Sequence, residues 1–135
     1  MFQALLSALL SALTVQPKMT RGWRAVLTVL LCVIAWLALT PVPPRQADLG
    51  WDKLNHLSAF GTLAVVAVLG RCGPYGRIAA GLLAYGGLIE LLQTFVPNRS
   101  GEWADLLADG VGIALGLLLA AGWRRLVVKS AAPAD

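Results

Sequence analysis

Long apolar stretches alternate along this chain with short polar segments rich in proline or glycine. Four stretches reach or approach the length of about 20 residues that a helix needs to cross a bilayer. They run from about residues 23 to 40, 52 to 69, 77 to 96 and 101 to 123. "TPVPPR" ends the first and Pro97 ends the third, because proline cannot continue a helix. The pattern predicts an all-α integral membrane protein with a bundle of four transmembrane helices.

The composition agrees with this fold class. Of the 135 residues, 58% are hydrophobic and 13% are charged, whereas a soluble domain carries about 25% charged residues. The charges gather between the apolar stretches and are nearly absent within them. We therefore expect one four-helix transmembrane domain over residues 23–125, preceded by an N-terminal segment (1–22) and followed by a cytoplasmic tail (126–135).

The basic residues predict the orientation. The net charge is +4, but no basic run is interleaved with aromatic residues, so nucleic acid is not the expected partner. If the chain crosses four times, one side receives only Arg45, Lys53 and Arg99. The opposite side receives Lys18, Arg21, Arg24, Arg71, Arg77, Arg124, Arg125 and Lys129. The positive-inside rule then places both termini in the cytoplasm.

The first 16 residues, "MFQALLSALLSALTVQ", are apolar and uncharged. They lack the basic region that opens a signal peptide. One interpretation is an extra helix at the membrane interface, with its wetter side formed by Gln3, Ser7, Ser11 and Thr14. The other is that translation starts at Met19. The sequence leaves both open.

Three of the expected helices carry polar side chains near the outer surface. In the second, Lys53 shares a face with His56 by its spacing of three. In the third, Glu90 and Gln93 are three residues apart, and Arg99 follows the helix. In the fourth, Asp105 and Asp109 are four apart, and their face continues as Gly112 and Gly116, a spacing that lets another helix approach closely.

These side chains should face the interior of the bundle. An ionised group in hydrocarbon costs at least about 2.5–3.5 kcal/mol, so we expect Glu90 and the two aspartates to pair with Lys53, His56 or Arg99, or to take up protons. Each has a purely structural alternative, such as a helix cap at Asp52 or a Glu90–Lys53 or Glu90–Arg99 pair that only joins helices. Glu90 is the hardest to explain in this way, because it lies mid-helix.

Neither a metal site nor a cofactor is expected from the motifs. His56 is the single histidine, and Cys32 and Cys72 form no CxxC motif. The two cysteines are expected at different depths, so a disulfide is not predicted.

Two segments resemble the VanZ-like family of small polytopic bacterial membrane proteins. They are "DKLNHLSAF" and "IELLQTFVPNRSGEWADLLADGVGIALG", and the resemblance covers about residues 50–120. Leu57 stands where an aromatic residue is common, and Asp109 stands where asparagine is expected. The resemblance implies a multi-pass protein of the bacterial inner membrane. It also implies a link to the cell envelope, because the family is named after a member associated with low-level resistance to teicoplanin, which carries an acyl chain.

Two classes of function follow from the polar residues. The first is a binding or transport module for a membrane lipid or lipid-linked envelope precursor, with a ligand site formed by Lys53, His56, Glu90, Gln93, Arg99, Asp105 and Asp109. The second is an intramembrane hydrolase or transferase acting on a lipid head group, with His56, Glu90 and Asp105 as catalytic candidates. A structural partner of an envelope complex, with a protein partner or a second copy of the chain, is a third alternative.

Overall fold

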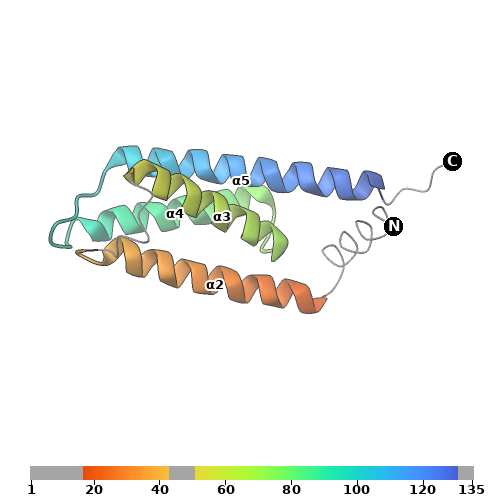
Figure 1. The fold of residues 1–135 in the computed structure, drawn as a ribbon, viewed down its shortest axis with the longest axis horizontal. Helices are drawn as coiled ribbons and strands as arrows, with labels where there is room; N and C mark the ends of the chain where they lie inside the picture. The colour runs from red at the N-terminus through yellow and green to blue at the C-terminus, as the bar shows by residue number, and fades with distance from the viewer. Residues whose placement is uncertain (1–16, 43–50, 131–135) are drawn as a thin grey trace.

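The computed structural model describes residues 17–42 and 51–130, which form four helices and contain no strand (Figure 1). The helices are α2 (Pro17–Leu39), α3 (Asp52–Leu69), α4 (Tyr75–Gln93) and α5 (Trp103–Ser130). They lie side by side along the long axis of the molecule, and successive helices run in opposite directions. The all-α fold class is thus confirmed. The N-terminal interfacial helix expected within residues 1–16 lies outside the described residues.

The helix boundaries follow the sequence pattern, with the largest differences at the start of α2 and at the ends of α4 and α5. α2 begins at Pro17, six residues before the expected start at about residue 23. α3 has the expected bounds, but α4 ends at Gln93, three residues before the expected end. The chain turns there: the Phe95 N–H donates to the Leu92 carbonyl oxygen at 3.0 Å, and the Val96 N–H donates to the Gln93 carbonyl oxygen at 3.0 Å. α5 continues past Trp123 to Ser130, because no proline or glycine interrupts it there.

α3 makes its most extensive contacts with α5, and glycines allow the two backbones to touch. A Cβ atom added to Gly112 would overlap the carbonyl oxygen of Leu57, and one added to Gly116 would overlap that of Gly61. The close approach expected from the Gly112–Gly116 spacing is therefore present. This contact brings the first turns of α3 and α5, which carry polar residues, next to each other.

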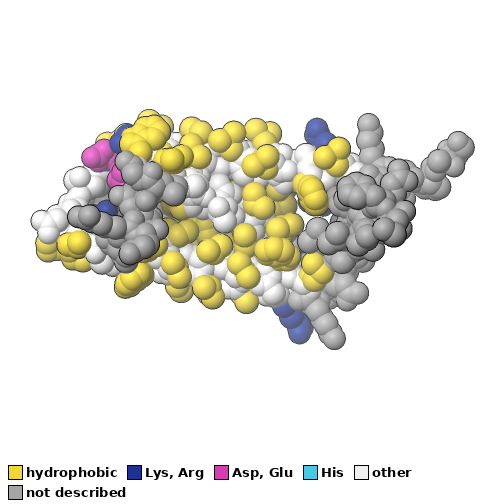
Figure 2. Space-filling model, viewed as in Figure 1, with side chains coloured by type: hydrophobic (Ala, Val, Ile, Leu, Met, Phe, Trp, Pro, Cys, Tyr) yellow, Lys and Arg dark blue, Asp and Glu magenta, His cyan; other side chains and the backbone are white. Residues whose placement is uncertain are grey.

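The interior of the bundle is apolar along most of its length. Its largest fully enclosed side chains include Phe60 and Leu63 of α3, and the core extends to Ile78 and Leu82 of α4 and Ile113 of α5. Large apolar side chains also cover much of the outer surface, whereas charged side chains gather toward the two ends (Figure 2).

Among the helices that the structure describes, two are long and apolar enough to cross a membrane, over Met19–Leu39 and Trp103–Leu126. α3 and α4 are shorter, with 18 and 19 residues, and carry several of the polar residues singled out above.

At one end of the bundle, the Arg24 side chain of α2 forms hydrogen bonds with the turn that follows α3. Its Nε donates to the Gly70 carbonyl oxygen at 2.8 Å and its Nη2 to the Arg71 carbonyl oxygen at 3.2 Å.

Candidate functional site

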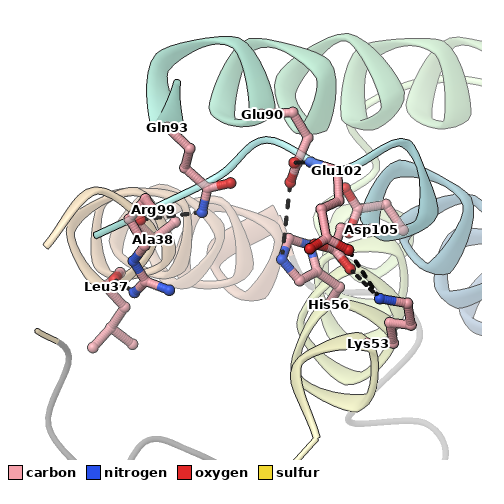
Figure 3. A network of polar contacts seen from close by, with 10 residues as sticks. Leu37, Ala38, Lys53, His56, Glu90, Gln93, Arg99, Glu102 and Asp105 are labelled. Carbon is pink, nitrogen blue, oxygen red and sulfur yellow. Dashed lines mark hydrogen bonds and ion pairs between the residues drawn. The ribbon is translucent and has the colours of Figure 1, made fainter. Parts of the chain in front are cut away.

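A group of ionisable side chains lies at the other end of the bundle, where α2 and α4 end and α3 and α5 begin (Figures 1 and 3). We call it the polar cluster. α3, α4, the segment before α5, and α5 itself contribute its six residues, which are Lys53, His56, Glu90, Glu102, Asp105 and Asp109. The structure thus brings together five of the seven residues expected to form a ligand site.

His56 is the centre of the polar cluster. Its Nδ1 lies 2.9 Å from Oδ1 of Asp109 on α5, and its Nε2 lies 3.9 Å from Oε1 of Glu90 on α4. Its ring stacks on Phe60, one turn further along α3. An ionised Asp109 can only accept a hydrogen bond, so in the neutral imidazole Nδ1 carries the proton. The lone pair of Nε2 is then directed away from Asp109, on the side of the ring that faces Glu90.

Lys53 and Glu102 form the exposed rim of the polar cluster. Nζ of Lys53 lies 3.3 Å from Oε2 of Glu102 and 3.4 Å from Oδ1 of Asp105. The backbone N–H of Glu102 donates to Oε2 of Glu90 at 2.8 Å, which fastens the segment before α5 onto α4. The Lys53 and Glu102 side chains are 34% and 52% exposed. The polar cluster is therefore reachable from this side.

The floor of the polar cluster is buried and short of hydrogen-bond donors. Asp109 is fully enclosed and Glu90 is 9% exposed. Oδ2 of Asp109 and Oε1 of Glu90 are buried without a hydrogen-bond partner among the described residues. Gly86 makes room for the first of these atoms, because a Cβ there would overlap it. A buried acceptor without a partner costs about 1–3 kcal/mol. Oδ2 of Asp109 is enclosed against Gly86, whereas Oε1 of Glu90 belongs to a side chain that keeps some exposed surface, so Glu90 is the residue where a ligand would gain a contact.

Gln93 and Arg99 lie beside the polar cluster and hold the end of α2 (Figure 3). Nε of Arg99 donates to the Thr40 carbonyl oxygen at 3.2 Å, and its Nη2 donates to that of Leu37 at 3.0 Å. Nε2 of Gln93 donates to the Ala38 carbonyl oxygen at 3.1 Å. The last carbonyls of a helix lack intrahelical partners, and a cation there complements the helix dipole. These contacts account for both side chains structurally.

The pairing partners differ from those considered from the sequence. Within the described residues, Glu90 contacts His56 and the amide of Glu102, and it pairs with neither Lys53 nor Arg99. Glu102 is a member of the polar cluster that the sequence analysis did not single out. Its position three residues before Asp105, at the start of a helix, could have predicted that it belongs to the polar cluster.

Two residues of the polar cluster form, together with the neighbouring Asp52, the donor set of a metal site. Asp52, His56 and Asp105 each offer one ligand atom, and these three atoms lie within 4.8 Å of one another. Asp52 is exposed, His56 is partly buried and Asp105 is buried.

Cys32 and Cys72, which do not belong to this group, are both free.

A family model described as VanZ/LLP1 matches residues 4–125. The chain belongs to the VanZ/LLP1 family. The match extends beyond the segment on which the resemblance was based, and it includes α2. Family membership and the two long apolar helices together indicate a membrane protein. A search of curated proteins and a search of solved structures found no match.

Proposed function

We propose that this VanZ/LLP1-family protein crosses the bacterial inner membrane four times and binds the polar head group of a lipid or lipid-linked envelope component. The ligand would enter the polar cluster from the outer face. Arg24, Arg71 and Cys72 mark the opposite end of the bundle. Because that end carries most of the basic residues, the positive-inside rule assigns it to the cytoplasm.

The observation that carries this proposal is that the polar cluster lies next to apolar side chains exposed on the outer surface of the bundle. Glu90 and Asp109 are buried, and the partly exposed Lys53 and the exposed Glu102 belong to the same polar cluster. Exposed apolar side chains follow directly in sequence on three elements, at Leu54, Leu91 and Trp103. A molecule with an acyl chain and a polar head could therefore contact both surfaces at once.

The charges indicate which head groups would suit the polar cluster. Lys53 already contacts two carboxylates, and Arg99 already contacts carbonyls of α2. A bare phosphate would therefore have to share these two cations with partners that they already contact. The unpartnered oxygen of Glu90 instead favours a head group that donates hydrogen bonds from hydroxyl, amine or amide groups. Such chemistry is also compatible with a role in resistance to acylated glycopeptides.

Native mass spectrometry of the purified protein would test this proposal by measuring co-purified envelope lipid. We expect Glu90→Gln and His56→Ala to reduce lipid retention by about tenfold or more, because a hydrogen bond to a charged group contributes about 1.5–3 kcal/mol. Thr62→Ala is the matched control, since Thr62 is exposed on α3 and bonds only its own helix. Equal lipid retention in all four proteins would contradict the proposal.

The contact between His56 and Asp109 supports a second candidate function, hydrolysis or transfer at the head group. A histidine whose Nδ1 is held by a carboxylate can use Nε2 as a general base or acid. Asp109, rather than Glu90 or Asp105, supplies that carboxylate at 2.9 Å. Ser58 bonds carbonyl oxygens of its own helix, so hydrolysis would use water as the nucleophile and transfer would use a hydroxyl or amine of a second substrate. Turnover of a labelled envelope lipid by the wild type, lost in His56→Ala, would favour catalysis over binding alone.

A further inference from the structure

We propose that the polar cluster also holds a divalent transition-metal cation, coordinated by Nε2 of His56 and by carboxylate oxygens of Asp52, Asp105 and Glu90. The sequence motifs do not predict this site, because its donors come from three helices rather than from one short motif. The inference does not depend on lipid binding, since every proposed ligand atom belongs to the protein.

The first support is the convergence of three donors. Asp52 and His56 lie one turn apart on α3, and Asp105 lies in the first turn of α5. Their candidate ligand atoms, a ring nitrogen of His56 and one oxygen of each aspartate, are within 4.8 Å of one another. Metal–ligand distances for histidine nitrogen and carboxylate oxygen are about 2.0–2.2 Å. Two ligands of one cation are therefore at most about 4.4 Å apart, so a closure of about 0.4 Å would let this group supply three ligands to one cation.

The second support is a buried carboxylate oxygen directed at the same histidine. Glu90 is 9% exposed, and its Oε1 is buried without a hydrogen-bond partner among the described residues. That atom lies 3.9 Å from Nε2 of His56, and Figure 3 shows the two side chains approaching each other from α4 and α3. This separation is less than two metal–ligand distances. One cation can therefore contact both atoms, and it would give Glu90 Oε1 the partner that it lacks.

The third support is the group behind the histidine. Nδ1 of His56 lies 2.9 Å from Oδ1 of the fully enclosed Asp109. Histidines that bind metals almost always donate their other ring N–H to a carboxylate or carbonyl, which orients the ring and makes the ligating nitrogen more basic. In this arrangement Asp109 is a positioning residue and Nε2 is the metal ligand.

The charge balance also favours a cation. Among the described residues, Asp52 and the four carboxylates of the polar cluster gather around His56 and Lys53, while Arg99 beside them donates to the end of α2. Lys53 contacts Oδ1 of Asp105 at 3.4 Å, and a carboxylate has enough acceptor sites to serve a lysine and a metal together. Imidazole nitrogen selects transition metals over Mg²⁺ and Ca²⁺, which prefer oxygen ligands alone.

Titration with Mn²⁺ would test the site, using the full chain purified without a histidine tag, stripped of metal and lipid, and kept in detergent. Electron paramagnetic resonance measures the free Mn²⁺ that remains in solution. We expect one saturable site per chain, from which Zn²⁺ displaces Mn²⁺. Because neither cysteine is a preferred ligand of Mn²⁺, this probe reports on the polar cluster. Absence of saturable binding of either metal would overturn the inference.

Two variants distinguish coordination of Mn²⁺ by Asp52 from a general electrostatic attraction of Mn²⁺ to acidic side chains. Asp52→Asn and Glu102→Gln each remove one carboxylate charge from an exposed residue of the same region. We expect Asp52→Asn to weaken Mn²⁺ binding by about tenfold, and Glu102→Gln to weaken it much less. Equal losses in the two variants would overturn the proposed ligand set. Both residues are exposed, and circular dichroism of each variant should match the wild type.

His56→Gln provides a further check on the ligand itself. The loss of the imidazole nitrogen should remove the Zn²⁺ competition as well as the Mn²⁺ site. Retention of wild-type affinity for both metals in His56→Gln would overturn the inference. The measurement contains no lipid, so its failure would leave the proposed head-group binding intact.

Discussion

His56 of α3 and Asp109 of α5 are joined across the bundle, with Nδ1 and Oδ1 2.9 Å apart. Asp109 has no exposed surface, and its second carboxylate oxygen lies against Gly86 of α4. The pair therefore lies where three helices meet. One turn further along α5, Gly112 touches the backbone of α3 at Leu57. The polar contact and the glycine contact together position the polar cluster.

Removal of Asp109 should destabilise the protein strongly. Breaking a buried charged pair by deleting one partner costs about 3–5 kcal/mol, and Asp109→Ala also leaves a cavity between three helices. Asp52→Ala, on an exposed residue of the same region, should have a much smaller effect. Thermal unfolding in detergent, followed by circular dichroism, measures the difference. Similar midpoints for the two variants would show that the His56–Asp109 pair contributes little to stability.

Substitution by alanine should be tolerated at Gly110 of α5 but should destabilise the protein at Gly112. A Cβ at Gly112 would overlap the Leu57 carbonyl oxygen, whereas the nearest atom to a Cβ at Gly110 is a side-chain carbon of Leu83 at 3.7 Å. Gly112→Ala should therefore force α3 and α5 apart, at a cost of about 1–3 kcal/mol. Gly110→Ala should be neutral or stabilising, because alanine favours helix.

The same thermal unfolding experiment distinguishes the two glycine variants. Gly112→Ala should lower the midpoint relative to both the wild type and Gly110→Ala. Equal midpoints for the two variants would contradict the close backbone contact between α3 and α5.

Arg99→Lys should loosen the end of α2 more than it affects ligand binding. The guanidinium donates to the carbonyls of Thr40 and Leu37 from two different nitrogens, and a lysine ammonium cannot reproduce that planar geometry. We expect faster amide hydrogen exchange over the last turn of α2, with lipid retention reduced less than in Glu90→Gln. A loss of lipid as large as that of Glu90→Gln, with unchanged exchange, would instead make Arg99 a ligand residue.

The proposed orientation predicts which cysteines react in intact cells. Cys72 lies in the turn between α3 and α4 and is exposed. In a Cys32→Ser background, a membrane-impermeant maleimide should leave Cys72 unmodified until the cells are opened. Ser100, exposed at the opposite end of the bundle, is the control position: Ser100→Cys in a variant without the two native cysteines should react in intact cells. The reverse labelling pattern would invert the proposed topology.

Much of the helical architecture could be predicted from the sequence. Apolar length, proline and glycine located the helices, and α3 was predicted with its observed bounds. The end of α4 was misplaced by three residues, because Phe95 and Val96 are apolar yet belong to a turn before Pro97. The local sequence pattern shows only which residues are apolar. In a protein with an apolar exterior, both the last turn of a helix and the turn that follows it can be apolar, so the pattern cannot locate the end of the helix.

The sequence by itself determined that polar residues of three helices lie near the same end of the bundle, since in successive antiparallel helices this depends only on their distance from helix ends. The tertiary structure alone decided their partners. In the folded protein His56 contacts Asp109, and Lys53 contacts Glu102 and Asp105. Arg99 donates hydrogen bonds to carbonyl oxygens at the end of α2. Pairing depends on the rotation and axial position of each helix relative to its neighbours. Those quantities are set by packing between helices, such as the contact of Gly112 with Leu57, and residue spacing within one helix carries no information about them.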